Sequence, residues 1–165
     1  VVDRRTGALP PGSVALLEDA ERTPMGLVAV NPASKIMCRM LDPAGTQAPD
    51  KAWFAERISH ALALRTRLFD TPYYRLIHAE ADGLPGVIID RFGDLAVVQP
   101  NAAWADLYLE AMVEALVDVT GVTTVLKNAG GRGRTLEGLD DVDAVLVGTA
   151  PAAPLPGRMN DATYR

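Results

Sequence analysis

The sequence predicts an α+β fold in which a small β-rich unit is followed by a mixed α/β unit. Short apolar runs bounded by Gly, Pro, Asn and Asp recur along the chain, and such runs are typical of strands. Two longer segments carry apolar residues at three- and four-residue spacings, which is typical of amphipathic helices. The 165 residues are 48% hydrophobic and 22% charged, the proportions of a globular protein.

The β-rich unit is assigned to residues 1–48. Three apolar runs lie between Gly12 and Leu41, and the segments that separate them contain turn-forming residues. This pattern favours a small antiparallel sheet. The three predicted strands are SVALLE, GLVAVN and KIMCRML.

The α/β unit is assigned to residues 49–148, with antiparallel strands and two helices. Asp50 is a predicted N-cap for a helix that ends before the DTP segment after Phe69. A second helix is predicted from Ala103 to Val119, with Gly121 as its stop. The predicted strands are YYRLIHAE, GVIID, LAVVQP, VTTVLKN and DAVLVG, and DRFGD closes a hairpin between the second and third. Residues 149–165, which begin with a Pro/Ala-rich run, are predicted to be a linker.

Charge is unevenly distributed along the chain. The net charge is −5, which argues against a uniformly basic surface. Residues 101–150 hold three basic and eight acidic side chains, whereas the helix from Lys51 to Phe69 holds four basic and one acidic. The basic residues of this helix and of the strand before it could contact a phosphate backbone. A solvent-exposed helix face explains this excess of basic residues equally well. The predicted RNA contacts are Lys35, Arg39, Arg57, Arg65 and Arg67.

The segment from Ala79 to Asp94, AEADGLPGVIIDRFGD, has four acidic side chains that could bind a cation or act in acid/base catalysis. Its Asp-Gly and Pro-Gly pairs are turn-forming, and Asp90 and Arg91 are expected to form a local ion pair at a hairpin. We therefore interpret the segment as architecture. The predicted structural residues are Asp82, Gly83, Pro85, Gly86, Asp90 and Arg91.

No catalytic, cofactor-binding or metal-binding residue is predicted. The glycine-rich run NAGGRGRTLEGL has Leu136 where a dinucleotide fingerprint needs its third glycine, so it is either a flexible connection or a phosphate-contacting loop. Cys38 lies in an apolar strand and is expected to be a small core residue. His60 and His78 are expected to be surface or satisfied core residues. One cysteine and two histidines make a Cys/His metal site unexpected.

The composition also predicts a location. A single cysteine cannot form an internal disulfide, and the first residues lack the apolar segment of a secretory signal. No stretch approaches the roughly 20 apolar residues that a membrane span requires. We expect a soluble, cytoplasmic protein that does not associate with membranes.

The stretch YYRLIHAEADGLPGVIIDRFGDLAVVQ resembles the central domain of a methyltransferase family. These are class I S-adenosylmethionine (SAM)-dependent enzymes that contain a PUA domain and methylate carbon 5 of a cytosine in large-subunit ribosomal RNA. GSVALLEDAERTPMGLVAVNPASKIMCRML is similar to the second half of their PUA domain, and RTLEGL matches the close of their central domain. The resemblance covers roughly residues 12–148.

The resemblance implies an incomplete PUA-like β domain, a central domain, and a linker toward a Rossmann-like methyltransferase domain that is absent from this chain. It implies a parent enzyme that uses SAM and attacks the cytosine ring with a cysteine. This chain would then be the RNA-recognition and scaffold region, inactive alone and without SAM. Ribosomal RNA is the implied partner.

Two other functions remain open from the sequence. The acidic balance of residues 101–150 is also typical of a non-enzymatic protein-interaction or dimerisation module, so the chain could form a homodimer. A methyltransferase of the same family that acts on another nucleic acid or on protein would have the same visible residues. The sequence does not separate these alternatives.

Overall fold

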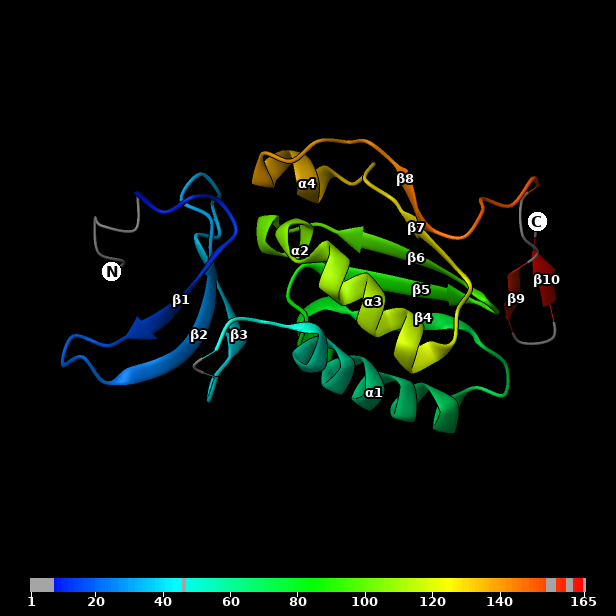
Figure 1. Ribbon diagram of the computed structural model, residues 1–165, viewed down its shortest axis with the longest axis horizontal. Helices are drawn as coiled ribbons and strands as arrows, with labels where there is room; N and C mark the ends of the chain where they lie inside the picture. The colour runs from blue at the N-terminus through cyan, green and yellow to red at the C-terminus, as the bar shows by residue number, and fades with distance from the viewer. Residues whose placement is uncertain (1–7, 46, 154–156, 160–161, 165) are drawn as a thin grey trace.

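A computed structural model describes residues 8–45, 47–153, 157–159 and 162–164 of the chain (Figure 1). The β unit contains β1 (Ser13–Glu18), β2 (Pro24–Val30) and β3 (Cys38–Asp42). The α/β unit contains α1 (Lys51–Leu68), β4 (Tyr73–His78), η2 (Ala79–Asp82), β5 (Val87–Phe92), β6 (Leu95–Pro100), α2 (Ala103–Leu107), α3 (Leu109–Thr120), β7 (Thr124–Lys127), α4 (Arg132–Glu137) and β8 (Ala144–Val147). Two short strands follow, β9 (Gly157–Met159) and β10 (Ala162–Tyr164).

The β unit is an antiparallel sheet in the order β1-β2-β3, as predicted. Strand β3 begins three residues later than its apolar pattern indicated, because a turn occupies the start of the run. Asn31 builds this turn: its carbonyl accepts from the Ser34 N–H at 3.1 Å, and its side chain accepts from the Ala33 N–H at 3.1 Å. The turn points Lys35 toward solvent.

Helix α1 has the boundaries that the sequence predicted. The Asp50 carboxylate accepts a hydrogen bond from the Trp53 N–H at 2.8 Å, which satisfies one of the free donors of the first turn. Phe54, Ile58 and Ala61 form its buried side. Helix α1 also packs against the short helix η2.

The main sheet is mixed, with the order β4-β5-β6-β7-β8. All five predicted strands are present, and the DRFGD segment closes the β5–β6 hairpin with Phe92 opposite Leu95. The expectation of antiparallel strands is wrong for one pair, because β6 and β7 are parallel. The reason is the helical segment between them, since a crossover connection through a helix returns the chain in the same direction.

The second predicted helix is divided into α2 and α3 at Tyr108, whose backbone leaves helical geometry at φ −100° and ψ 16°. The hydrogen bonds continue on either side of the break, from the Tyr108 N–H to the Trp104 carbonyl and from the Met112 N–H to the Tyr108 carbonyl. Gly121 ends α3 with a positive φ, as predicted. Helix α4 was not predicted.

One hydrophobic core joins the two units. Helices α1 and α3 pack side by side on one face of the main sheet (Figure 1). Phe54 and Trp104 stack with ring centroids 6.0 Å apart, and the Trp104 indole donates to the Pro85 carbonyl at 2.9 Å. Leu27 and Leu41 of the β unit belong to the same buried cluster. The β unit therefore packs directly on the α/β unit.

The predicted linker, residues 149–165, lies partly outside the described residues. Within it, β9 pairs antiparallel with β10, so part of this segment is strand rather than extended linker. No helix in the described part of the chain is long and apolar enough to cross a membrane.

Candidate functional site

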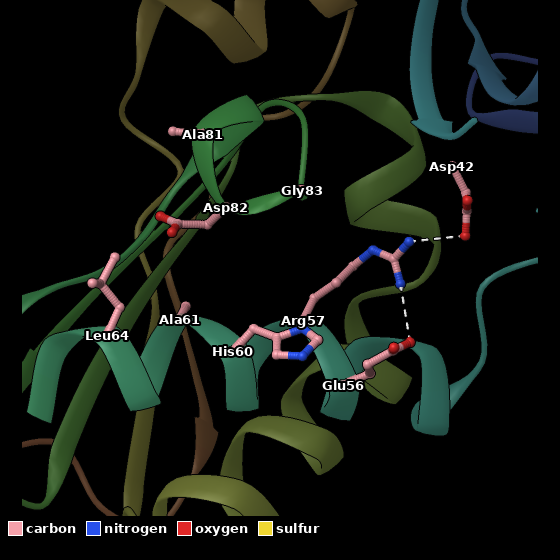
Figure 2. Close-up of a pocket in the computed structure, with 9 residues that line it drawn as sticks. All are labelled: Asp42, Glu56, Arg57, His60, Ala61, Leu64, Ala81, Asp82 and Gly83. Atoms are coloured by element: carbon pink, nitrogen blue, oxygen red, sulfur yellow. Dashed lines mark hydrogen bonds and ion pairs between the residues drawn. The ribbon is translucent and has the colours of Figure 1, made fainter. Parts of the chain in front are cut away.

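A groove of about 550 Å³ lies between α1 and η2 (Figure 2). Its walls carry charged side chains from three parts of the chain: the end of β3, the exposed side of α1 and the turn around η2. The residues that define it here are Asp42, Glu56, Arg57, His60, Asp82 and Gly83. This α1–η2 groove includes one of the predicted RNA contacts, Arg57.

A second hollow of about 500 Å³ adjoins the α1–η2 groove, and Gly83 lines both. Alternate residues Ile36, Cys38 and Met40 form its apolar wall. Cys38 is half-buried at the start of β3. The expectation that Cys38 is a core residue is therefore wrong, because its side chain faces this hollow rather than the buried side of the sheet.

Arg65 makes a two-pronged ion pair with Asp82. Its two terminal nitrogens lie 3.0 and 2.6 Å from the two carboxylate oxygens, and the side chains are only 12% and 9% exposed. The same carboxylate accepts from the His78 N–H at 2.7 Å. Gly83 follows with φ +72°, a left-handed conformation that favours glycine. Arg65 therefore fastens η2 to α1.

Arg57 is also engaged within the protein. Its guanidinium lies 2.9 Å from the Asp42 carboxylate (Figure 2). It also lies 3.5 Å from the centre of the Trp53 ring. Burial by itself would raise the pKa of Asp42, but hydrogen bonds from the Ala44 N–H, Arg57 and Trp53 hold that pKa below its ordinary value. Arg57 thus ties the end of β3 to α1.

Arg39 takes part in a buried network at the junction of the two units. Its NH2 group lies 3.1 Å from Glu137, a carboxylate that is 5% exposed. Glu137 also accepts from the Asn31 amide at 2.8 Å, the Ser34 hydroxyl at 2.7 Å and the Ala103 N–H at 3.4 Å. One side chain of α4 therefore holds the β2–β3 turn, β3 and the start of α2.

The hydrogen bonds keep Glu137 ionised. Burial by itself would raise the pKa of Glu137, but the donors of Asn31, Ser34 and Arg39, with the Ala103 N–H, lower it below its ordinary value. An ionised carboxylate with several hydrogen-bond partners therefore connects the two units at the junction. Sequence reasoning missed this role of Glu137, although the residue lies within RTLEGL, one of the segments that carried the resemblance.

Arg134 is a second buried charge in α4. Its NH1 group lies 2.8 Å from the Asp106 carboxylate and 2.7 Å from the Pro100 carbonyl, and its Nε donates to the Asp140 carbonyl at 2.7 Å. The glycine-rich run is therefore neither a free connection nor an open loop. It leads into a helix that is anchored by two inward charges, Arg134 and Glu137.

The predicted RNA contacts thus divide into two groups. Arg39, Arg57 and Arg65 hold internal ion pairs, whereas Lys35 and Arg67 are exposed. Among the basic residues whose side chains the structure describes, four make no ion pair or side-chain hydrogen bond with another described residue. These are Arg22, Lys35, Arg67 and Arg132.

The remaining motif residues have internal contacts. The expected pair of Asp90 with Arg91 is not formed: Asp90 instead binds Arg75 across the β4–β5 pair at 2.9 Å. Arg91 donates to the carbonyls of Gly93 and Thr120. The local pair fails because neighbouring strand residues point to opposite faces of a sheet. His60 and His78 are exposed.

The residues of the chain do not fit a SAM site in the glycine-rich connection. The β7–α4 connection is a strand, glycine loop and helix, as many nucleotide sites are. However, a Cβ on Gly131 would meet the Asn101 side-chain oxygen at 3.0 Å, so Asn101 already occupies the space beside the loop. The third glycine of the fingerprint is replaced by Leu136. We therefore assign no residue to this cofactor.

The chain is similar in sequence to ribosomal RNA methyltransferases. It is 38% identical over 136 residues to ribosomal RNA large subunit methyltransferase I of Alteromonas mediterranea, a match that covers 81% of this chain and 34% of that protein. It is 32% identical over 158 residues to the protein of the same name from Klebsiella pneumoniae, covering 94% of this chain and 40% of that protein. The chain thus spans about a third to two fifths of the length of these curated relatives. No protein-family model matches it.

Solved structures share the fold. A protein from Streptococcus mutans described as a SAM-dependent methyltransferase superposes with a TM-score of 0.79 at 18% identity, over 94% of this chain and 40% of that one. A methyltransferase in complex with SAH gives a TM-score of 0.78 at 17% identity, over 94% of this chain and 39% of that one.

These structures contradict the expected fold class, an α+β chain from which a Rossmann-like methyltransferase domain is absent. Nearly the whole chain, with its five-stranded mixed sheet, is shared with SAM-dependent methyltransferases and is consistent with a Rossmann-like methyltransferase fold. The expectation had been carried over from the domain order of the resembled family and not worked out from the residues of this chain. The chain therefore resembles ribosomal RNA large subunit methyltransferase I in sequence and SAM-dependent methyltransferases in fold, in each case over part of their length.

Proposed function

We propose that this chain is the RNA-recognition and scaffold region of a SAM-dependent methyltransferase that modifies carbon 5 of a cytosine in large-subunit ribosomal RNA. The observation that carries the proposal is the 38% identity to ribosomal RNA large subunit methyltransferase I across 81% of the chain. Ribosomal RNA is accordingly the proposed partner, and the cytoplasm the proposed location.

The scaffold part of the proposal is supported by the internal ion pairs. Arg57 and Arg65 connect α1 to β3 and to η2, and Arg39 connects β3 to α4. Such pairs fix the positions of exposed groups on the surrounding surface. Of the five predicted RNA contacts, Lys35 and Arg67 have no internal partner and could contact phosphates directly. The three paired arginines would act by keeping the surrounding surface groups in position.

RNA binding by the 165-residue chain tests the recognition part. A fluorescently labelled hairpin of large-subunit ribosomal RNA is titrated at two salt concentrations about fourfold apart and followed by anisotropy. Binding by several cations weakens steeply with salt, because each phosphate contact releases counterions. An affinity that does not change with salt, or no binding at either concentration, would remove recognition from these residues.

The same chain is proposed to neither bind SAM nor catalyse methyl transfer by itself. Calorimetric titration with SAM tests this directly. Specific binding in the micromolar range would contradict it and would place cofactor residues within the chain.

The reaction and its target are tested in cells. Deleting the reading frame that contains this chain should remove one 5-methylcytosine from large-subunit ribosomal RNA, as measured by nucleoside mass spectrometry and mapping. A full complement of 5-methylcytosine, with loss of a methyl group from another RNA or from a protein, would assign the enzyme to a different substrate.

A second candidate function is self-association through the main sheet. Strand β8 is the last strand in the sheet order, and Val145 on it is exposed, as is the preceding Val142. Exposed edge strands with apolar side chains can pair with another chain. Light scattering at high protein concentration should then give the mass of a dimer, whereas a monomer mass would exclude this function.

A further inference from the structure

Two free cations lie on either side of the junction between the β unit and the α/β unit. Lys35 is in the β2–β3 turn, and Arg132 is the first residue of α4. Both are exposed, and neither makes an ion pair or side-chain hydrogen bond with another described residue. The other two free cations, Arg22 and Arg67, lie in the β1–β2 turn and near the end of α1, far from the junction (Figure 1).

The backbone around Lys35 is held by hydrogen bonds on both sides. The Ser34 hydroxyl accepts from the Ile36 N–H at 3.2 Å and donates to Glu137 at 2.7 Å. The Asn31 N–H donates to the Met37 carbonyl at 2.8 Å and closes the turn. Lys35 therefore projects from a fixed turn, so that binding a ligand orders its side chain but not its backbone.

The direction of Arg132 follows from helix geometry. Arg134 points inward and is 1% exposed. Successive residues of an α-helix are separated by about 100° around the axis, so a side chain two residues away lies nearly opposite. Arg132 therefore points away from the α/β core, on the exposed side of α4.

Glu137 connects the two segments that carry these cations. It lies five residues after Arg132 on α4, about 7.5 Å along the helix axis, and its carboxylate contacts Ser34, the residue before Lys35. The charge of Glu137 is balanced by Arg39 at 3.1 Å. The carboxylate of Asp140, beyond the end of α4, is engaged by Lys127 and Arg134. The junction thus presents two positive side chains whose nearest acidic neighbours in the network already have partners.

We propose that Lys35 and Arg132 form a two-point phosphate contact for one RNA strand that crosses the junction, with Glu137 as the residue that positions them. The inference rests on the proposed RNA-binding function and adds a place and an orientation to it. The contact needs both units, so the β2–β3 turn and α4 act together although nearly a hundred residues separate them.

The test compares single and double substitutions in the 165-residue chain, with the labelled ribosomal RNA hairpin as probe. Lys35→Ala and Arg132→Ala should each weaken binding about two- to fivefold, the range of an exposed charge contact. Each should also lower the slope of log affinity against log salt by about 0.7 to 1, and the double variant by about twice that. Arg22→Ala is the matched control, since it removes an equally free cation from the opposite end of β2, roughly 20 Å away.

The results of this test distinguish a specific contact at the junction from diffuse attraction by charge and from a failure of RNA binding. Loss of slope in both junction variants with an unchanged slope in Arg22→Ala supports the inference. Equal losses in all three variants would mean diffuse attraction by charge and would overturn it, as would an unchanged slope in the double variant. If the unsubstituted chain does not bind the RNA, the proposed recognition function itself fails. Thermal melting of each variant verifies that the fold is intact, which is expected because the removed side chains have no internal partners.

Discussion

The two units of the molecule are stabilised in different ways. The α/β unit has an extensive apolar core in which large side chains such as Phe54, Trp104 and Leu116 are fully buried. The β unit has few buried apolar residues, confined to one stretch of β2 and to Leu41. It depends on the surface of the α/β unit and on one buried carboxylate, Glu137, for its position. A three-stranded sheet without a core of its own is thus kept in place by the shared apolar cluster and by the polar contacts of the junction.

The difference shows where a change should affect the whole fold and where it should affect only the junction. Loss of apolar volume in the α/β core removes support from both units, since they share one cluster. Loss of Glu137 should release the β unit and leave the main sheet folded. The following predictions separate these effects, from the largest to the smallest.

Trp104→Ala should destabilise the entire chain by about 3 to 5 kcal/mol, the usual cost of removing a buried aromatic side chain. Trp104 is 1% exposed, stacks on Phe54 and donates to the Pro85 carbonyl. Urea unfolding followed by circular dichroism measures the change. A loss below about 1 kcal/mol, the size seen for surface substitutions, would contradict the role of Trp104 in the common core.

Glu137→Ala should cost about 3 kcal/mol, because it leaves the partly buried Arg39 guanidinium and the Asn31 amide without their shared acceptor. Hydrogen exchange should show lost protection in β2 and β3 and retained protection in β5 and β6. Uniform loss of protection in all four strands would mean that the two units unfold together and that the β unit does not unfold independently.

Arg65 and Asp82 should show a coupling energy of about 1 to 3 kcal/mol in a double-mutant cycle, since both side chains are largely buried and make two parallel hydrogen bonds. The cycle uses Arg65→Ala, Asp82→Ala and the double variant, with unfolding in urea as the measurement. Additive effects would show that η2 is held to α1 by other contacts.

Low pH should reduce the free energy of unfolding, partly through Glu137. The pKa of Glu137 in the folded protein lies below its ordinary value of 4.5, so the unfolded chain takes up a proton first as pH falls. The stability from Glu137 is therefore present above about pH 4.5 and is lost as pH falls through the lower folded pKa. Unfolding free energies from pH 7 to pH 3 should fall more steeply for the natural chain than for Glu137→Gln. The pKa of Asp42 is also lowered, and its contribution has the same direction in both proteins. Parallel curves of unfolding free energy against pH would therefore contradict the assignment to Glu137.

Arg75→Ala should have the smallest effect, less than about 1 kcal/mol, although Arg75 forms a well-aligned ion pair with Asp90. The reason is solvent screening, since the Arg75 side chain is 43% exposed. Measured by the same urea unfolding, this pair is the surface counterpart of the Arg65 and Asp82 pair. Equal losses for the two arginines would show that burial does not decide the strength of these pairs.

Much of the local structure could be predicted from the sequence. Asp50 caps α1 because its side chain reaches an N–H three residues away, and Gly93 allows the β5–β6 hairpin because it adopts a positive φ. Both effects act between neighbours in the chain. The strands of the main sheet were found for the same reason, since alternating or continuous apolar runs are local patterns.

The candidate site could be predicted only in part. The sequence identified the basic residues of α1 and β3, but it gave the same weight to Arg65, which is internally paired, and to Arg67, which is free. It missed Glu137 and Arg134, because a charged residue in a glycine-rich run carries no local sign of burial. Asn31 and Glu137 are 106 positions apart, and nothing in the residues between them indicates that they meet.

The sequence by itself determined the main strands, the bounds of α1, the β5–β6 turn and the charge of each segment, because these depend on residues within a few positions of one another. Only the tertiary structure decided that β6 and β7 run parallel, that three of the five predicted RNA contacts are paired with carboxylates, and that Glu137 contacts both units. Those features depend on which surfaces are buried against each other, and burial fixes whether a charge is paired within the protein or left free to meet a ligand.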